Sequence, residues 1–205
     1  MNKESNTRDI FIKEFPSLAA EPAPLGLLGL AVAALVLASA DLGASSSAAK
    51  SLMIPWVLFF GATAQVIAGF KDFKRNNIFG ATVFTIYGML WYAVGLTLIL
   101  TIYTGAPFDL AHYGWGLVGV LAFSLIFTIA SALANKVFFA ILVGIDLAVA
   151  SLVSHVLAGT SETPVGVFLV FVSLLSFYAA GAILINGMTG KTIFPMGSPL
   201  WVPRK

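Results

Sequence analysis

Six long apolar stretches separated by short polar gaps dominate this sequence, and they limit the folds that the chain can adopt. Each is close to the roughly 20 residues that an α-helix needs to cross the hydrocarbon core of a bilayer. Apolar residues make up 59% of the chain and charged residues 10%, which leaves too little polar surface to cover a soluble globule. The sequence therefore predicts an all-α integral membrane protein, a bundle of six transmembrane helices at about residues 24–42, 52–70, 78–103, 114–134, 137–158 and 164–186.

The basic residues predict the orientation of this bundle. Of the 11 Lys and Arg residues, all except Lys50 fall before the first stretch, after the last, or in the two gaps that would share a side with them. Cytoplasmic loops carry an excess of Lys and Arg. We therefore expect both termini in the cytoplasm, with a tail over residues 1–21, a transmembrane domain over 22–187 and a second tail over 188–205, in a cell (cytoplasmic) membrane.

Small residues recur at helical spacing in several stretches. They form three ridges, at Gly26, Gly29 and Ala33, at Gly61, Ala64 and Ala68, and at Gly116, Gly119 and Ala122. Helices in lipid pack through small residues that let their backbones approach closely. Such ridges serve contacts within one bundle as readily as contacts between subunits, so the sequence leaves this choice open.

Composition excludes several functions. The chain has no Cys and only two His, which are far apart in the sequence, so we expect no thiolate chemistry and no metal site. No basic patch with stacking aromatic residues indicates nucleic acid, and no phosphate-binding loop indicates a cofactor. Ser154 and His155 point about 100° apart on a helix and cannot act as a nucleophile and base by adjacency. We expect no enzyme activity, cofactor or nucleic-acid partner.

One acidic residue lies near the middle of a predicted span. An ionised carboxylate facing lipid costs several kcal/mol, roughly 3 on insertion scales, so Asp146 must face the interior of the bundle or be neutral. We hypothesise that Asp146 exchanges a proton during transport. The alternative is a neutral acid that is hydrogen-bonded to a neighbouring helix, and the residue pattern does not separate the two.

Four further residues bring hydrogen-bonding groups into the spans: Gln65, Tyr87, Tyr178 and Asn186. Such groups suit a pathway that binds a small polar solute. They could equally join helices to one another. The pathway is favoured because several separate spans each contribute such a group.

The start of the first span offers a candidate anion site. Pro24, Leu25, Gly26 and Leu27 follow Pro22, and prolines are tolerated in the first turn of a helix because its amides have no intrahelical partner. The remaining amides and the positive end of the helix dipole attract carboxylates. The other interpretation of this segment is a rigid helix start.

Four separated segments resemble the motifs of one family. Residues 22–27 (PAPLGL) match Asn-Pro-Ala-Pro-Leu-Gly-Leu from its second position, 65–69 (QVIAG) resemble AQ-x-x-AG, and 77–91 (NIFGATVFTIYGMLW) resemble NTFG-x-T-x-FT-x-YG-x-FW. Residues 186–197 (NGMTGKTIFPMG) resemble N-x-x-x-G-(R/K)-T-x-x-P-x-G. In this order on six spans, the segments make the chain similar to the acetate uptake transporter family.

The resemblance implies a homo-hexamer of six-helix protomers in the lipid bilayer, each with its own solute path. It implies uptake of small monocarboxylates, chiefly acetate and in some members succinate, either with protons or through an anion channel without obligatory proton coupling. Ammonia or ammonium transport is a third, lower-ranked alternative. The resemblance also implies an apolar constriction, with Leu30 at a position that is usually aromatic, Tyr87 at the family tyrosine, and Ile141 or Leu142 as the aliphatic residue.

The sequence departs from the family pattern at two positions. Glu21 replaces the motif Asn, and an ionised Glu21 would repel an anion, so we expect it to be protonated or paired. Bacterial relatives often have a Glu three residues before the position of Asn186, where this chain has Ile183. Asp146 is the candidate to replace that carboxylate in proton coupling.

Overall fold

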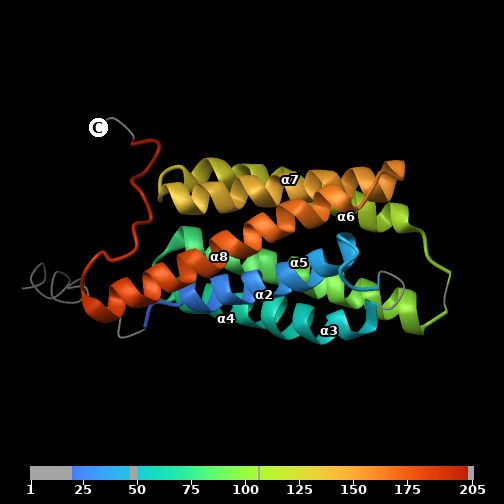
Figure 1. The fold of residues 1–205 in the computed structure, drawn as a ribbon, viewed down its shortest axis with the longest axis horizontal. Helices are drawn as coiled ribbons and strands as arrows, with labels where there is room; N and C mark the ends of the chain where they lie inside the picture. The colour runs from blue at the N-terminus through green and yellow to red at the C-terminus, as the bar shows by residue number, and fades with distance from the viewer. Residues whose placement is uncertain (1–19, 47–49, 106, 203–205) are drawn as a thin grey trace, which may run out of the picture.

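The computed structural model describes residues 20–46, 50–105 and 107–202, and these form six long spans (Figure 1). Each is long and apolar enough to cross a membrane, which confirms the predicted all-helical, six-span fold. Most of the predicted N-terminal tail (1–21) lies outside the described residues. Five spans are single helices and the second is composite: α2 (Ala23–Asp41); η1 (Lys50–Leu52), α3 (Met53–Trp56), η2 (Val57–Ala64) and α4 (Gln65–Phe73); α5 (Ile78–Tyr103); α6 (Leu110–Ser131); α7 (Lys136–Ala158); and α8 (Thr163–Thr189).

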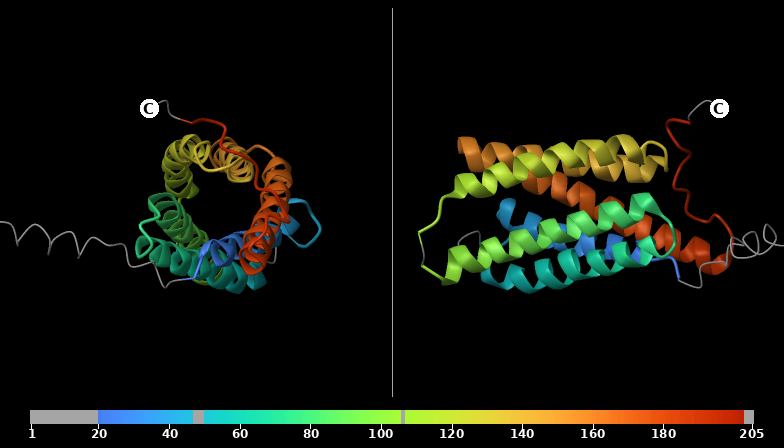
Figure 2. Two further views of the ribbon diagram at one scale, coloured as in Figure 1. Left: turned by 90° about the vertical axis from the view of Figure 1, so that its left-hand side faces the viewer. Right: turned by 180° about the vertical axis from the view of Figure 1, so that it is seen from behind.

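Viewed along its length, the bundle is a ring of helices (Figure 2). The order around the ring is α2, the second span, α5, α6, α7 and α8, and α2 also packs extensively on α8. The pair α5 and α6 makes the fewest contacts of any neighbours in the ring. We call the end that carries the described termini, Ala20 and Val202, the proximal end, and the opposite end the distal end.

The helix ends follow local rules of capping. Asn77, Asp109 and Asn135 each accept a hydrogen bond from a backbone amide in the first turn of α5, α6 and α7, over 3.2, 2.9 and 2.9 Å. Such caps satisfy amides that have no partner within the helix. Gly159 and Gly190 end α7 and α8 with φ of 69° and 64°, the left-handed conformation that glycine adopts without strain.

The second span changes its winding in the middle of the bundle. Over η2 the backbone is a π-helix, a form that is rare and frequently occurs at functional sites. The hydroxyl of Thr63 donates to the carbonyl of Leu58, five residues earlier, over 2.8 Å, and lies 2.9 Å from the hydroxyl of Tyr92 on α5. The π-helix ends at Ala64, and Gln65 begins α4.

Two of the three predicted ridges pack inside this chain. A Cβ atom at Gly29 would collide with the backbone carbonyl oxygen of Phe60, and one at Gly61 would lie 2.7 Å from the ring of Trp91. Nothing in the described part of the chain lies within 4 Å of a Cβ atom built at Gly116 or Gly119. The first two ridges therefore join α2, the second span and α5, whereas the third faces outward.

We expect Gly29→Ala to destabilise the bundle by about 1–3 kcal/mol, because the new methyl group meets backbone that cannot move aside. The matched variant is Gly119→Ala, which adds the same methyl group to open space on α6. Thermal unfolding in detergent measures both. Equal melting temperatures for the two variants would contradict the close approach of α2 to η2.

Candidate functional site

Two cavities lie inside the ring, one above the other along its axis. The proximal cavity has a volume of about 230 Å³ and the distal cavity about 60 Å³. Each is lined from helices on opposite sides of the ring. The proximal lining is Glu21, Ala23, Leu27, Leu30, Gln65, Asn77, Phe79, Gly80, Val83, Phe84, Tyr87, Phe138, Ile141, Leu142, Ile145 and Ile183.

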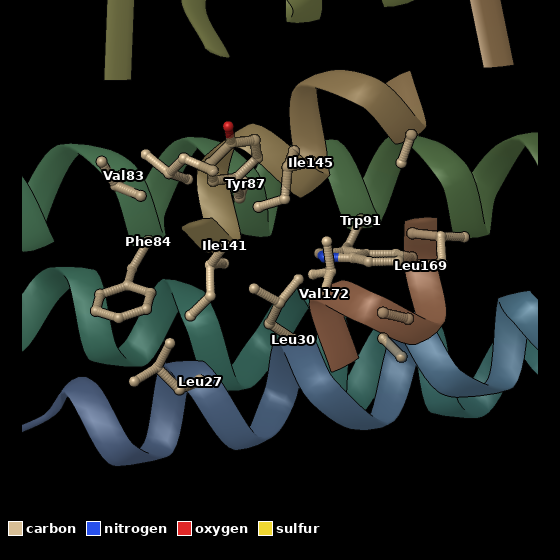
Figure 3. Close-up of a cluster of buried hydrophobic side chains, with 14 of the residues drawn as sticks. Leu27, Leu30, Val83, Phe84, Tyr87, Trp91, Ile141, Ile145, Leu169 and Val172 are labelled. Carbon is tan, nitrogen blue, oxygen red and sulfur yellow. The ribbon is translucent and has the colours of Figure 1, made fainter. Parts of the chain in front are cut away.

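The two cavities share three lining residues: Leu30 of α2, Tyr87 of α5 and Ile145 of α7 (Figure 3). These three side chains are almost fully buried and stand where one cavity gives way to the other. Leu30 and Tyr87 are residues that the family resemblance assigned to a constriction. Ile141 and Leu142, its aliphatic candidates, line the proximal cavity alone, and Ile145, one helical turn beyond Ile141, holds the shared position.

The distal cavity has a wholly apolar lining. Beyond the three shared residues it is formed by Leu37, Leu90, Trp91, Val94, Leu117, Ala148, Val149, Leu152, Val165, Leu169 and Val172. Trp91 is buried at 6% exposure and forms part of this wall. A hydrated ion entering such a space loses hydrogen bonds that the lining does not replace.

Polar groups gather instead in the proximal cavity. Gln65 is 1% exposed, and its Nε2 atom has no hydrogen-bond partner among the described residues. Asn77 is occupied as the cap of α5. An unpaired amide donor next to a cavity can bind an acceptor such as a carboxylate oxygen.

Glu21 lies at the entrance of the proximal cavity and is paired. Its Oε2 atom accepts a hydrogen bond from Nη2 of Arg75 over 2.7 Å, and its Oε1 atom accepts one from the amide of Ala23 over 3.2 Å. The chain's own carboxylate thus caps the first helix. Of the two expected states, protonated or paired, the structure shows Glu21 paired with Arg75.

The four residues of the predicted anion site lie on different faces of α2 and do not form one site. Leu27 lines the proximal cavity, Pro24 and Gly26 are buried, and Leu25 is exposed on the outside of the ring. The amide of Ala23 is occupied by Glu21. Of these four residues, only Leu27 borders the cavities.

Asp146 lies outside both cavity linings, between α6 and α7. Its two carboxylate oxygens accept hydrogen bonds from the hydroxyls of Ser124 and Thr128, the second over 2.7 Å. The oxygen of Ser124 lies 2.7 Å from the hydroxyl of Tyr87. A chain of hydroxyl groups therefore links Asp146 to Tyr87, which lines both cavities, and Asp146 is hydrogen-bonded to a neighbouring helix.

Tyr178 and Asn186 hold the C-terminal segment rather than line a cavity. Asn186 accepts hydrogen bonds from the amides of Ile193 and Phe194 over 2.8 and 3.0 Å, and donates one to the carbonyl of Phe194 over 2.7 Å. Tyr178 donates to the carbonyl of Pro195 over 2.8 Å. We call residues 191–202 the C-terminal strap, because the segment runs from α8 across the proximal end to the corner between α6 and α7 (Figure 1).

A cluster of ionisable residues lies at the distal end. Lys50 lies 3.8 Å from Asp41 and 3.6 Å from Glu162, and Nε2 of His155 lies 3.1 Å from the same Glu162. Within the described ranges no group of three or more His, Asp or Glu is placed to hold a metal ion. This cluster joins α2, α7 and α8 away from the cavities.

Comparisons with known proteins place this geometry in context. The sequence profile of the GPR1/FUN34/yaaH family matches residues 10–197. The succinate-acetate/proton symporter SatP of Escherichia coli K12 is 35% identical over 81 residues, 40% of this chain and 42% of that protein, so the match spans less than half of the symporter. Acetate permease A of Emericella nidulans is 28% identical over 202 residues, 90% of this chain and 68% of the permease.

Two further matches cover most of the chain. Ammonia transport outward protein 2 of Saccharomyces cerevisiae is 30% identical over 173 residues, 80% of this chain and 61% of that protein. A solved structure of the bacterial acetate channel SatP superposes with a TM-score of 0.80 at 26% sequence identity, covering 87% of this chain and 99% of that one.

We expect Asn186→Ala to release the C-terminal strap, because the variant loses all three side-chain hydrogen bonds to Ile193 and Phe194. Limited trypsin digestion in detergent should then cleave after Lys191 faster than in the unmodified protein, by about tenfold for a loss near 1.4 kcal/mol. Thr101→Val on α5 removes a hydroxyl that bonds only within its own helix and serves as the control. Cleavage at the same rate in both variants would show that Asn186 does not hold the strap.

Proposed function

The chain belongs to the GPR1/FUN34/yaaH family, and from this premise we propose that it carries small monocarboxylates, chiefly acetate, across a membrane. The relatives support this proposal: the names of the bacterial symporter and the fungal permease specify acetate, and the superposed structure is that of an acetate channel. A transporter family also agrees with the expectation that the chain is not an enzyme.

The observation that carries the proposal is the pair of cavities that meet at Leu30, Tyr87 and Ile145. A solute that passes along the ring must cross this apolar contact. Acetate is small enough to occupy a volume of about 230 Å³, and a two-carbon acid offers little more than one carboxyl group and one methyl group for recognition. The constriction is therefore the place where the pathway selects acetate over hydrated ions.

The chemistry of the two cavities suggests how the step proceeds. In the proximal cavity the Nε2 atom of Gln65 donates a hydrogen bond to the carboxyl group. At the constriction the carboxyl group loses its water, which costs several kcal/mol or more, roughly 2–7 even for a neutral polar group without a partner. The neutral acid crosses at much lower cost than the anion, so the apolar walls favour passage of acetate together with a proton.

Asp146 is the candidate for handling that proton. It lies beside the constriction, and the hydroxyls of Ser124 and Tyr87 connect it to the cavity wall. Because Ile183 lines the proximal cavity where bacterial relatives often have a Glu, the cavity itself offers no equivalent carboxylate at that position. The alternative is an anion channel without obligatory proton coupling, in which Asp146 only joins α6 to α7.

The arrangement in the membrane follows from charge. The proximal end carries Lys71, Lys74, Arg75, Lys136 and Lys191, and the distal end carries Lys50. By the positive-inside rule the proximal end faces the cytoplasm. The outward-facing ridge of Gly116 and Gly119 agrees with assembly into a homo-hexamer, and the chain resides in the cell membrane.

The name of the yeast relative, which specifies ammonia transport, suggests ammonia or ammonium as a second candidate solute. His155 is bound to Glu162 at the distal end and His112 lies near the start of α6. Neither lines the two cavities that meet at the constriction. The unpaired donor of Gln65 requires an acceptor, for which a carboxylate offers two oxygens, whereas ammonium offers none and neutral ammonia a single lone pair.

Filling the constriction should stop transport. We expect Ile145→Phe to lower acetate flux into proteoliposomes by about tenfold or more, because the larger side chain closes an apolar passage. Leu147→Phe makes a similar change on the same helix, at a side chain that is exposed on the outside of the ring, and should keep its flux. A normal flux through Ile145→Phe would place the pathway elsewhere.

The test of the proposed function is uptake of labelled acetate by the purified protein in liposomes, with and without an inward proton gradient. We expect acetate to accumulate only with the gradient. Asp146→Asn should equilibrate acetate but no longer accumulate it, since the amide cannot take up and release a proton at neutral pH.

Each other outcome has a distinct meaning. Equilibration by the unmodified protein, without accumulation, would support the channel alternative. Accumulation by Asp146→Asn that equals the unmodified protein would remove Asp146 from proton coupling. If acetate flux does not depend on the protein, the same liposomes measured for ammonium flux test the second solute.

A further inference from the structure

Ser124 joins three helices at the level of the constriction. From α6 it reaches the hydroxyl of Tyr87 on α5 and the carboxylate of Asp146 on α7. Its side chain is fully buried and lines neither cavity. Nothing in the sequence marks Ser124 as a functional residue, because it is one of two serines in an apolar helix.

The direction of these hydrogen bonds follows from the number of protons that each of the three side chains can donate. A serine hydroxyl has one proton to donate, whereas an ionised carboxylate only accepts. When Asp146 is ionised, Ser124 donates its proton to the carboxylate, and the hydroxyl of Tyr87 must then donate to Ser124. Thr128 donates to the other oxygen of Asp146 over 2.7 Å, so Asp146 in turn holds its position relative to α6.

The side chain of Tyr87 contacts α6 through its ring and through its hydroxyl bond to Ser124. Two aromatic side chains of α6, Phe123 and Phe127, make T-shaped contacts with it, with ring centroids 5.8 Å apart in each case. These contacts and the bond to Ser124 join α5 to α6, the neighbours with the least extensive contact in the ring of helices. In Figure 3 the hydroxyl of Tyr87 points away from Leu30, so the bond draws the ring back from the opposite wall.

We propose that Ser124 is a positioning residue that holds Tyr87 against α6 and so sets the width of the constriction. Without the bond, the ring gains conformations that reach toward Leu30 and Ile145 and narrow the passage. The width then determines which monocarboxylic acids cross, and acetate is impeded more than the smaller formate. This inference rests on the proposed function, because it assumes that carboxylic acids pass between the two cavities.

The ratio of acetate flux to formate flux in proteoliposomes tests the proposal. We expect Ser124→Ala to lower this ratio about two- to tenfold, the range of population shifts that losing one hydrogen bond produces. Tyr87→Phe removes the same bond from the other side and should lower the ratio similarly. The double variant should show no further fall, because both changes act on one interaction.

The matched control is Ser173→Ala, which removes another fully buried serine hydroxyl, one that donates to the carbonyl of Ala31 over 2.8 Å. We expect its flux ratio to stay at the unmodified value. A general loss of stability lowers both fluxes together and leaves the ratio unchanged. Should Ser124→Ala fail to fold, Ser124→Cys keeps the size of the side chain with a weak donor and carries the same expectation.

The outcomes separate this inference from the proposed function. If the unmodified protein carries no acetate, the proposed function fails. If it carries acetate, an unchanged or raised ratio in Ser124→Ala overturns the positioning role while the proposed function stands. A ratio that falls additively in the double variant, or an unmodified protein that passes acetate but excludes formate, also overturns it.

Discussion

A chain inside a bilayer must satisfy its own polar groups, and this requirement organises the structure described here. No water competes for the amides and hydroxyls, so each unpaired group costs free energy. Helix caps at Asn77, Asp109 and Asn135 occupy terminal amides, and hydroxyls such as Ser173 bond to a backbone carbonyl of a neighbouring helix. Against this background, the buried Nε2 atom of Gln65 is one of a few side-chain atoms in the described residues without a partner, and it lies beside the proximal cavity.

The same requirement explains how a carboxyl group can be accommodated in the middle of the bundle. Asp146 receives two hydroxyl donors from α6, and the donors hold α6 and α7 together in return. Through Ser124 the network reaches Tyr87 and closes the ring where α5 and α6 otherwise touch least. One set of hydrogen bonds thus connects the packing of α5, α6 and α7 with the position of Tyr87.

The six spans could be predicted from length and hydropathy, because crossing a bilayer fixes both. The residue of α7 that lines both cavities could be predicted only to within one helical turn: Ile145 shares a helical face with Ile141, but periodicity does not say which turn lies level with Leu30. Tyr178 and Asn186 have the polarity of pathway residues, yet a sequence does not show which way a side chain points around its helix. Glu21 and Arg75 are 54 residues apart, and Ser124 acts through partners on two other helices. Such relations depend on how the helices are rotated against one another.

The C-terminal strap has a consequence for biogenesis. The amides of Leu200 and Trp201 bond to the carbonyl of Ala132 at the corner between α6 and α7, over 2.8 and 3.1 Å. That corner is synthesised and inserted well before residue 201 leaves the ribosome. All six spans can therefore enter the bilayer before the carbonyl of Ala132 gains these partners, and the bundle is closed at this end only by the strap, which is translated after all six spans. Insertion of the six spans and closure of the proximal end are therefore separate events. A nascent chain paused before the strap would have all six spans in the membrane while the carbonyl of Ala132 still lacked these two hydrogen bonds.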